Sequence, residues 1–392
     1  MKIICVVGAR PNFIKIAPLM RSFSRLTSFE TLLVHTGQHY DARLSDIFFA
    51  QLGIRAPDVE LSVPPATQTA QTAEIMRRFE AVLEAEQPQG VLVVGDVNST
   101  VACALAAAKF RLADPFAWSG GRRSRPVIIH VEAGLRSFDD DMPEEINRKV
   151  TDVLSDLLFV SEPQGLINLA REGVPEERMH FVGNVMIDTL LAARREALGS
   201  GMLEKLGLLG REYGLVTLHR PGNVDDPQTL KTLIETLDSV AARLPLVFPV
   251  HPRTRKRLEE AGLAFPKGRW TLMEPVGYLE FLALQSGARL VLTDSGGVQE
   301  ETTALGVPCI TLRENTERPC TVSQGTNRIA GTSRETILGA FDLALAEGAG
   351  KGGVRMPALW DGHAAERVVK VLSASFDATV GATVNGARRW IA

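Results

Sequence analysis

The chain has 392 residues, of which 45% are hydrophobic and 23% are charged, with a formal net charge of −3 at pH 7. This composition is globular and provides material for two hydrophobic cores. The charge balance, with no block of Lys and Arg, argues against nucleic acid or an anionic membrane as a partner. No apolar run approaches the roughly 18 residues of a membrane span, and the N-terminal run is too short for a signal peptide. We therefore expect a cytoplasmic protein.

Short β-branched runs alternate with longer helical patterns along the chain. Apolar runs separated by helices are typical of parallel strands buried on both faces, so the pattern predicts an α/β fold. A single core rarely grows past about 250–300 residues, which favours two doubly wound units. The strand candidates are KIICVVG (2–8), TLLVHTG (31–37), GVLVVGD (90–96), VIIHVEAG (127–134) and DLLFVSE (156–162), followed by a second set of MHFVGN (179–184), GLVTLH (214–219), LVFPVH (246–251), RLVLTD (289–294) and PCITLR (308–313).

We place the boundary between the two units near Phe181. One unit then spans residues 1–180 and the other spans residues 181–365. A C-terminal segment, residues 366–392, continues the last apolar stretch (AAERVVKVLSAS), and we expect it to pack back on the first unit.

Two segments interrupt the alternation of strands and helices. Residues 109–126 are long, aperiodic and rich in Gly, Pro and Arg, so we interpret them as a surface insertion. Its position before a site-bearing strand leaves open whether it contacts the cleft or a second copy of the chain. Residues 347–357 (EGAGKGGVRMP) have the composition of a linker.

Polar residues follow the strand candidates in both halves of the chain. In open parallel sheets, ligands bind beyond the carboxyl ends of the strands. The pattern therefore predicts a ligand held between two facing units. The strand-end residues include Arg10, Gln38, Asp96, Glu132, Arg136, His219, Arg220, His251, Arg253, Asp294 and Ser295.

Two segments are candidate anion sites. In TDSGGVQEE (293–301), Ser295 and Gly296 open a helix whose free N–H groups would hold phosphate, and Glu301 would reach ribose hydroxyls. The alternative is a Gly-rich turn with Ser capping. In GARPNFIKIAPL (8–19), Arg10 and Lys15 would neutralise a diphosphate or bind a carboxylate, and the alternative is solvated charge.

The stretch HVEAGLRSFDDDMPEEINR (130–148) sets a strand against a dense run of charges. Glu132 ends the strand, so we expect it to point into the cleft. Glu144 and Arg148 are four apart on the following helix and would pair, functionally or as a surface salt bridge. The helix is predicted to bury the stripe Ile146, Val150, Val153 and Leu157.

The histidines and cysteines bear on cofactors. His219 and His251 directly follow strands of the second set and together favour a site, although a lone histidine is more often structural. No HxxxH or paired-carboxylate spacing supports a metal, and no dinucleotide fingerprint is present, so we expect neither cofactor. Without CxxC spacing, we expect buried free thiols at Cys5, Cys103, Cys309 and Cys320.

The motifs together resemble a known family. GARPNFIK, TGQH, GDVNST, HVEAGLRS, MPEEINR, TLHR, PVHPRT, TDSGGVQEE and TERP occur in the order seen in non-hydrolysing UDP-N-acetylglucosamine 2-epimerases. The resemblance implies the glycosyltransferase-B fold, a homodimer, and interconversion of UDP-N-acetylglucosamine and UDP-N-acetylmannosamine through 2-acetamidoglucal. It implies catalytic roles for Asp96, Glu132, Glu144 and His219. It implies substrate binding by Arg10, Lys15, Arg136, Arg148, His251, Ser295, Gly296, Glu301 and Arg318.

Alternatives stay open at this point. Epimerisation of a UDP-diacetamido-uronic acid suits several of the motifs, although TERP favours the N-acetylglucosamine enzyme. A glycosyltransferase on the same fold would need an acceptor, and a binding regulator would not need the intact acidic set. Many relatives are activated by a second UDP-N-acetylglucosamine through glutamines after the QH turn. Residues 39–49 lack them here, which argues against such activation.

Overall fold

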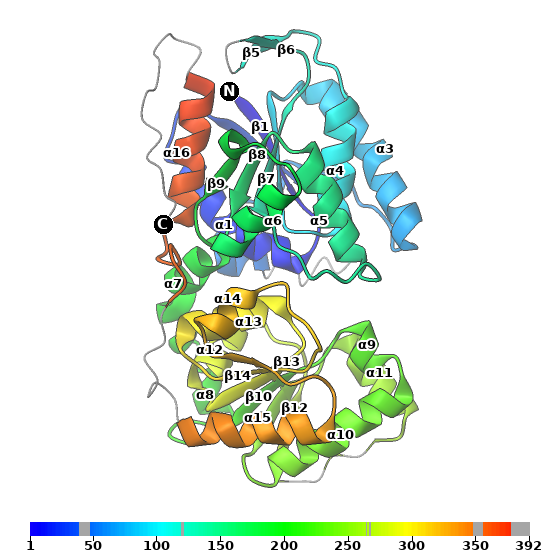
Figure 1. Cartoon of the computed structure of the whole chain (residues 1–392), viewed down its shortest axis with the longest axis vertical. Coiled ribbons are helices and arrows are strands. Elements are labelled where there is room, and N and C mark those ends of the chain that lie inside the picture. Colours follow the sequence, from blue (N-terminus) through cyan, green and yellow to red (C-terminus); the bar gives the residue numbers. More distant parts are fainter. Residues whose placement is uncertain (39–47, 119–120, 264, 266–267, 348–355, 378–392) are drawn as a thin grey trace.

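A computed structural model describes residues 1–392 apart from 39–47, 119–120, 264, 266–267, 348–355 and 378–392. Two parallel sheets, each covered by helices, lie one above the other (Figure 1). The predicted α/β class with two doubly wound units is confirmed.

The first sheet has the strand order β3-β2-β1-β4-β7-β8-β9. Its strands are β1 (Lys2–Val7), β2 (Glu30–His35), β3 (Val59–Glu60), β4 (Gly90–Val94), β7 (Val127–Ala133), β8 (Leu157–Val160) and β9 (Met179–Phe181). The second sheet has the order β12-β11-β10-β13-β14-β15. Its strands are β10 (Gly214–Thr217), β11 (Leu246–Pro249), β12 (Trp270–Met273), β13 (Leu290–Thr293), β14 (Cys309–Thr311) and β15 (Asn327–Ile329).

Helices follow most strands and cover both faces of each sheet (Figure 1). In the first unit they are α1 (Arg10–Phe23), α3 (Gln68–Glu86), α4 (Asn98–Lys109), α5 (Pro143–Leu154) and α6 (Pro163–Arg171), with the 3-10 turn η1 (Glu176–Arg178). The chain continues through α7 (Val185–Leu198), α8 (Met202–Lys205), α9 (Pro221–Val224), α10 (Pro227–Ala241), α11 (Pro252–Glu260), α12 (Tyr278–Gly287), α13 (Gly296–Leu305), α14 (Pro319–Ser323), α15 (Arg334–Glu347) and α16 (Ala364–Asp377).

Alternate residues of β1 enter two different cores. Cys5 and Val7 face a core that includes Phe13 of α1, whereas Ile4 faces a core with Phe79 of α3. Because a strand is buried on both sides only when layers cover both faces, the continuous apolar run of β1 follows from its central place in the sheet.

One predicted strand was assigned to the wrong sheet, and three strands at sheet edges were not predicted. MHFVGN was placed in the second set, but β9 pairs with β8 in the first sheet. The sequence reading missed β3, β12 and β15, which are short strands at sheet edges. Edge strands need no continuous apolar run, because one side stays exposed.

The C-terminal helix α16 packs against α1 and places Val368 and Leu372 in the same core as β1. Residues 378–392 of the predicted C-terminal segment lie outside the described residues. Helix α7 packs against both α1 and α12, so the division near Phe181 stays a prediction.

The insertion folds as an antiparallel hairpin of β5 (Phe116–Trp118) and β6 (Gly121–Arg123). It lies at the end of the first unit that is remote from the second sheet (Figure 1). The rings of Phe116 and Trp118 contact Phe376 of α16 at centroid distances of 6.3 and 4.4 Å. The described part of the insertion therefore lies away from the cleft. Most of the predicted linker, residues 348–355, lies outside the described residues.

The prediction of which face α5 buries was wrong. Ile146 and Val153 are 55% and 71% exposed, and Val150 is exposed as well. Leu157 belongs to β8 rather than to the helix. The buried residues of the helix are instead Glu145, Arg148, Thr151 and Asp152. The buried charges of α5 all have partners near the strand ends, which is the condition under which charge is tolerated in an interior.

Candidate active site

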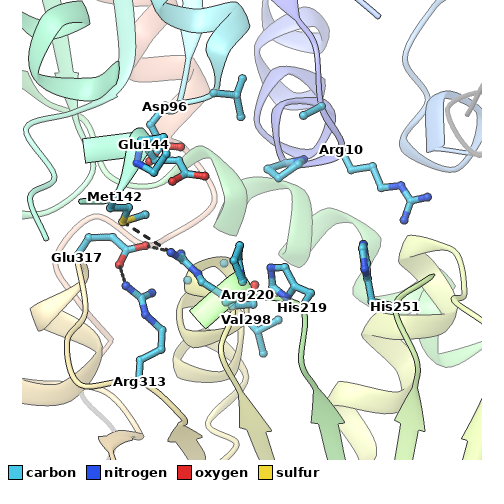
Figure 2. A pocket seen from close by; sticks show the side chains of 18 of the residues that line it. Arg10, Asp96, Met142, Glu144, His219, Arg220, His251, Val298, Arg313 and Glu317 are labelled. Carbon is cyan, nitrogen blue, oxygen red and sulfur yellow. Dashed lines mark hydrogen bonds and ion pairs between the residues drawn. The ribbon is translucent and has the colours of Figure 1, made fainter. Parts of the chain in front are cut away.

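A cavity of about 1130 Å³ lies between the two units, beyond the carboxyl ends of the central strands. Figure 2 shows side chains from both units entering it. Ten of the thirteen predicted site residues line it: Arg10, Lys15, Asp96, Glu144, His219, His251, Ser295, Gly296, Glu301 and Arg318. The structure therefore brings together residues that are far apart in the sequence, as expected at the switch points of doubly wound sheets.

Asp96 follows β4 at the wall of the cavity. Its carboxylate forms an ion pair with Arg148 of α5. Burial alone would raise the pKa of Asp96, but the charges of Arg148, Lys15 and Arg318 lower it below the ordinary value. Asp96 is therefore held as a carboxylate at a point where it can accept a proton. Arg148 contacts the cavity through Asp96 rather than as part of its described lining.

Glu132, the penultimate residue of β7, has a strained backbone conformation. Its φ is +73°, in the left-handed region that non-glycine residues rarely adopt, and the β7–β8 register shifts between Val131 and Ala133. Lys15 Nζ donates to its Oε1 at 2.7 Å, and Arg318 Nη2 of the second unit donates at 3.2 Å. Among the described residues, its Oε2 has no hydrogen-bond partner. Glu132 was expected to point into the cleft, but it lies outside the described lining, directly behind two cations that do line the cavity. Strain of this kind is often found at functional sites.

Glu144 and its neighbour Glu145 lie in different surroundings. The predicted Glu144–Arg148 pair was wrong, because Arg148 Nη1 donates to Glu145 Oε2 at 2.9 Å. Glu145 is fully buried and also accepts from the Ser137 and Phe138 backbone N–H groups. Glu144 lines the cavity in the first turn of α5. The structure therefore leaves Glu144 facing the ligand space.

His219 enters the cavity from the end of β10. Its Nδ1 lies 2.9 Å from Oδ1 of Asp294, which follows the neighbouring strand β13. Burial would raise the pKa of Asp294, but His219 and the backbone N–H groups of His219 and Arg220 lower it. Asp294 is thus an ionised partner that orients the imidazole, in the way a carboxylate orients a catalytic histidine. The ring of His251 lies 5.9 Å from that of His219 (Figure 2).

The N-terminus of α13, where an anion site was predicted, lines the cavity. Ser295 is its N-cap residue, and Gly296 begins the helix. A Cβ at Gly296 would meet Arg318 Nη1 at 2.6 Å and Glu317 Oε1 at 2.7 Å, so only glycine allows this close approach. First-turn N–H groups of a helix together with a guanidinium suit a diphosphate.

The carboxylate of Glu317 pairs with three arginines near the start of α13. Arg318, Arg313 and Arg220 lie 2.6, 2.9 and 3.4 Å from its carboxylate oxygens. Burial would raise its pKa, but these arginines lower it far below the ordinary value. Figure 2 shows Arg220 and Arg313 both joined to Glu317 by dashed lines. Arg318 also contacts Glu132 and Glu300, at 3.2 and 2.9 Å, so the guanidiniums and carboxylates form one ion-pair network beside the cavity.

Glu301 lines the same end of the cavity and is buried. Burial raises its pKa to about 7, with the nearby Glu300 adding to the shift. A carboxyl group that titrates near neutral pH can donate to one hydroxyl and accept from another. The predicted role of Glu301 at ribose hydroxyls remains a prediction that this chemistry suits.

Arg136 lies outside the described lining of the cavity. Its Nη2 is 2.7 Å from Asp152 and 2.6 Å from Glu172. The structure therefore places it in a buried network behind β7, and nothing in its position brings it to a ligand.

Sequence reasoning missed several lining residues. Asp294, which lies outside the described lining, was expected at this end of the sheet, but its pairing with His219 was not predicted. Glu317 stands in the TERP motif and Arg313 ends the strand candidate PCITLR, but the ion pair between them could not be predicted from the local sequence. The polar lining residues that were not among the predicted catalytic and binding residues include Asn98, Asn147, Arg220, Arg313 and Glu317.

Other sequence expectations concern groups outside the cavity. All four cysteines are buried and free, as predicted. Within the described ranges, no group of three or more His, Cys, Asp or Glu residues has metal-binding geometry. The helices in those ranges include none long and apolar enough to cross a membrane. The predicted lack of an activator site falls mainly on residues 39–47, outside the described part of the chain.

Solved structures similar to this one share its architecture. UDP-N-acetylglucosamine 2-epimerase of Methanocaldococcus jannaschii, in complex with UDP-N-acetylglucosamine and UDP, has a TM-score of 0.86 and 38% identity, covering 95% of this chain and 100% of that one. Sucrose-phosphate synthase of Thermosynechococcus elongatus has a TM-score of 0.56 at 15% identity, covering 97% of this chain and 96% of that one. The latter likeness concerns the fold alone, and together they confirm the glycosyltransferase-B architecture.

Sequence relatives agree with the structures. The curated M. jannaschii UDP-N-acetylglucosamine 2-epimerase is 38% identical over 382 residues, 95% of this chain and 99% of the relative. UDP-2,3-diacetamido-2,3-dideoxy-D-glucuronate 2-epimerase of Pseudomonas aeruginosa is 40% identical over 349 residues, 88% and 92% of the two chains. The profile of the family described as UDP-N-acetylglucosamine 2-epimerase matches residues 21–373. The chain belongs to the UDP-N-acetylglucosamine 2-epimerase family.

Proposed function

We propose that the chain interconverts UDP-N-acetylglucosamine and UDP-N-acetylmannosamine by elimination and re-addition of UDP. One observation carries the proposal: a single cavity combines ionised Asp96 and the Asp294-oriented His219 with the cationic N-terminus of α13. A similar enzyme was solved with UDP-N-acetylglucosamine and UDP bound.

The reaction requires both the groups proposed to act on the sugar and the groups proposed to stabilise UDP. The sugar carbon that bears the acetamido group loses its proton to a base, while the anomeric C–O bond breaks and UDP takes the electron pair. The resulting 2-acetamidoglucal then regains UDP at the anomeric carbon and a proton from the opposite face. The carbon acid is weak, so a positioned base such as Asp96 or Glu132 is needed. His219 is placed to serve the glycosidic oxygen.

The departing UDP carries negative charge that must be stabilised. Arg318, Arg220 and the first turn of α13 supply cations and N–H donors for it. We propose that these groups handle the diphosphate without a divalent ion. Dialysis against a chelator should leave turnover unchanged, and complete loss restored by one metal would contradict this.

The decisive experiment uses UDP-N-acetylglucosamine alone in deuterated water. The epimerase yields UDP-N-acetylmannosamine with deuterium at the inverted carbon. A glycosyltransferase would need an acceptor, and a binding regulator would yield nothing. A run from UDP-N-acetylmannosamine alone, without a lag, would support the lack of an activator site.

A second substrate deserves the same assay. The P. aeruginosa diacetamido-glucuronate epimerase is as similar to this chain as the N-acetylglucosamine enzymes are. Comparing kcat/KM for the two UDP-sugars decides between them. Turnover of only the diacetamido-uronate would overturn the first assignment and keep the reaction type.

We further propose a cytoplasmic homodimer. Four buried free thiols fit a reducing compartment. The stripe Ile146, Val150 and Val153 on α5 is apolar and exposed in the single chain. Such a stripe on a helix can pack against its own copy about a two-fold axis.

A further inference from the structure

His130 is a fully buried histidine of β7 that lies outside the cavity lining. Its Nδ1 is 2.6 Å from Oδ1 of Asp152, and its Nε2 is 2.8 Å from the carbonyl oxygen of Gly95. Both ring nitrogens therefore lie within hydrogen-bond distance of an acceptor oxygen. Gly95 directly precedes Asp96, so this contact holds the backbone of one of the carboxylates proposed to act on substrate.

Asp152 contacts residues on both sides of the other carboxylate, Glu132. Its Oδ2 accepts from the Gly134 backbone N–H at 3.1 Å and lies 2.7 Å from Arg136 Nη2. Gly134 comes two residues after Glu132, and His130 comes two residues before it. The strained backbone of Glu132 is therefore tied to Asp152 on both sides.

We propose that His130 and Asp152 are positioning residues that fix the separation of Asp96 and Glu132. The inference rests on the proposed epimerase function. Proton removal and return on opposite faces of one carbon require two groups at a constant spacing. A displacement of about 1 Å can cost roughly 10²-fold in rate. This assignment also gives Arg136 a role, as the cation that holds Asp152 rather than a substrate ligand.

A buried polar network can also be purely structural, and the chain contains a matched control for that case. Asp156 anchors the opposite end of β7: its Oδ2 accepts from the Ile128 backbone N–H at 2.9 Å, and Arg125 Nη2 lies 3.1 Å from its Oδ1. Like Asp152, it is an acid that pairs with an arginine and accepts from a backbone N–H at or next to an end of β7. It differs in lying at the end of the strand that is remote from the cavity.

The test compares Asp152→Asn and His130→Gln with Asp156→Asn in deuterated water. The readouts are kcat, KM, thermal midpoint and the ratio of released 2-acetamidoglucal to epimer. We expect the first two variants to lose roughly 10- to 100-fold in kcat, keep KM within about threefold, and release more glycal per epimer formed. KM is expected to hold because the residues that bind UDP are untouched. Asp156→Asn should lose stability but keep kcat and the product ratio.

Three outcomes are informative. If Asp152→Asn and His130→Gln lose only thermal stability, with kcat and product ratio unchanged, the network is structural and the proposal is wrong. If His130→Gln does not fold, Asp152→Asn decides alone, because its amide keeps the size and an acceptor oxygen. If the wild-type protein epimerises neither UDP-sugar, the proposed function has failed, which is distinct from active wild type with unaffected variants.

Discussion

Helices α5 and α10 are both amphipathic, but they bury opposite kinds of face. Helix α10 buries Leu230, Leu233 and Leu237 in the core of the second unit and exposes Lys231. Helix α5 exposes its apolar stripe and buries the charged residues Glu145, Arg148 and Asp152.

The difference reflects what each helix packs against. Helix α10 covers an apolar sheet face, so burying leucines contributes to stability. Helix α5 packs against β7 and supplies partners to Asp96, which follows β4, and to His130 within β7. A buried ion pair adds little net stability compared with apolar packing. We infer that the buried charges of α5 serve the placement of the site, and the predictions below test that contrast in order of decreasing effect.

The largest effect is expected for Asp96, the carboxylate that pairs with Arg148 of α5. Asp96→Asn keeps size but removes the charge paired with Arg148. Turnover should fall roughly 10²-fold or more, typical for the loss of acid–base catalysis. The measurement is the rate of epimer formation together with the thermal midpoint.

Asp238→Asn is the control on α10. Asp238 accepts from Trp270 Nε1 at 3.0 Å and lies outside the described cavity lining. Its turnover should match wild type. Near-normal turnover in folded Asp96→Asn would remove Asp96 from the catalytic group.

The next effect concerns the apolar face of α10. Leu237 is fully buried, so Leu237→Ala should cost about 2–5 kcal/mol in free energy of unfolding through lost burial and a cavity. Turnover of the fraction that stays folded should be unchanged. Urea unfolding followed by circular dichroism measures this. A cost below about 1 kcal/mol would show that α10 does not carry the core as described.

A pH dependence should distinguish the two helices. Burial would raise the pKa of Asp152, but His130 and Arg136 lower it below its ordinary value of 3.8. A depressed carboxyl pKa contributes stability that is fully present above about 3.8 and lost as pH falls through the folded-state pKa. The stability difference between wild type and Asp152→Asn should therefore shrink on acidification.

Leu237→Ala provides the comparison for this experiment, because leucine does not titrate. Its stability deficit relative to wild type should be the same at pH 7 and at low pH. Unfolding free energies at several pH values test both variants. A constant deficit for Asp152→Asn would mean that its ion pairs do not stabilise the fold.

The smallest effect on the single chain is expected on the exposed face of α5. Val153 is 71% exposed, so Val153→Arg should change monomer stability by no more than about 0.5 kcal/mol. If the stripe forms a homodimer, the variant should be monomeric at concentrations where wild type is dimeric. Sedimentation velocity over a concentration series measures this. A wild-type monomer at all concentrations would refute the dimer.

Much of the site could be predicted from local sequence. Buried strands followed by polar residues at 8–10, 94–96 and 217–219 indicated a cleft between two sheets, and Gly296 in TDSGGVQEE indicated an anion site. These signals are local, because the period of a strand and the N–H groups of a helix start depend on residues close in the chain.

What only the tertiary structure decided depends on partners far apart in the chain. Periodicity showed that residues 143–154 form an amphipathic helix, but not that Arg148 turns inward to meet Asp96 from a strand 52 positions earlier. The same holds for Arg136, which Asp152 holds away from the cavity, and for His219, which Asp294 orients. A charged side chain is buried only where a group of opposite charge lies next to it in the folded chain. The sequence contains both partners, but folding alone determines that they meet.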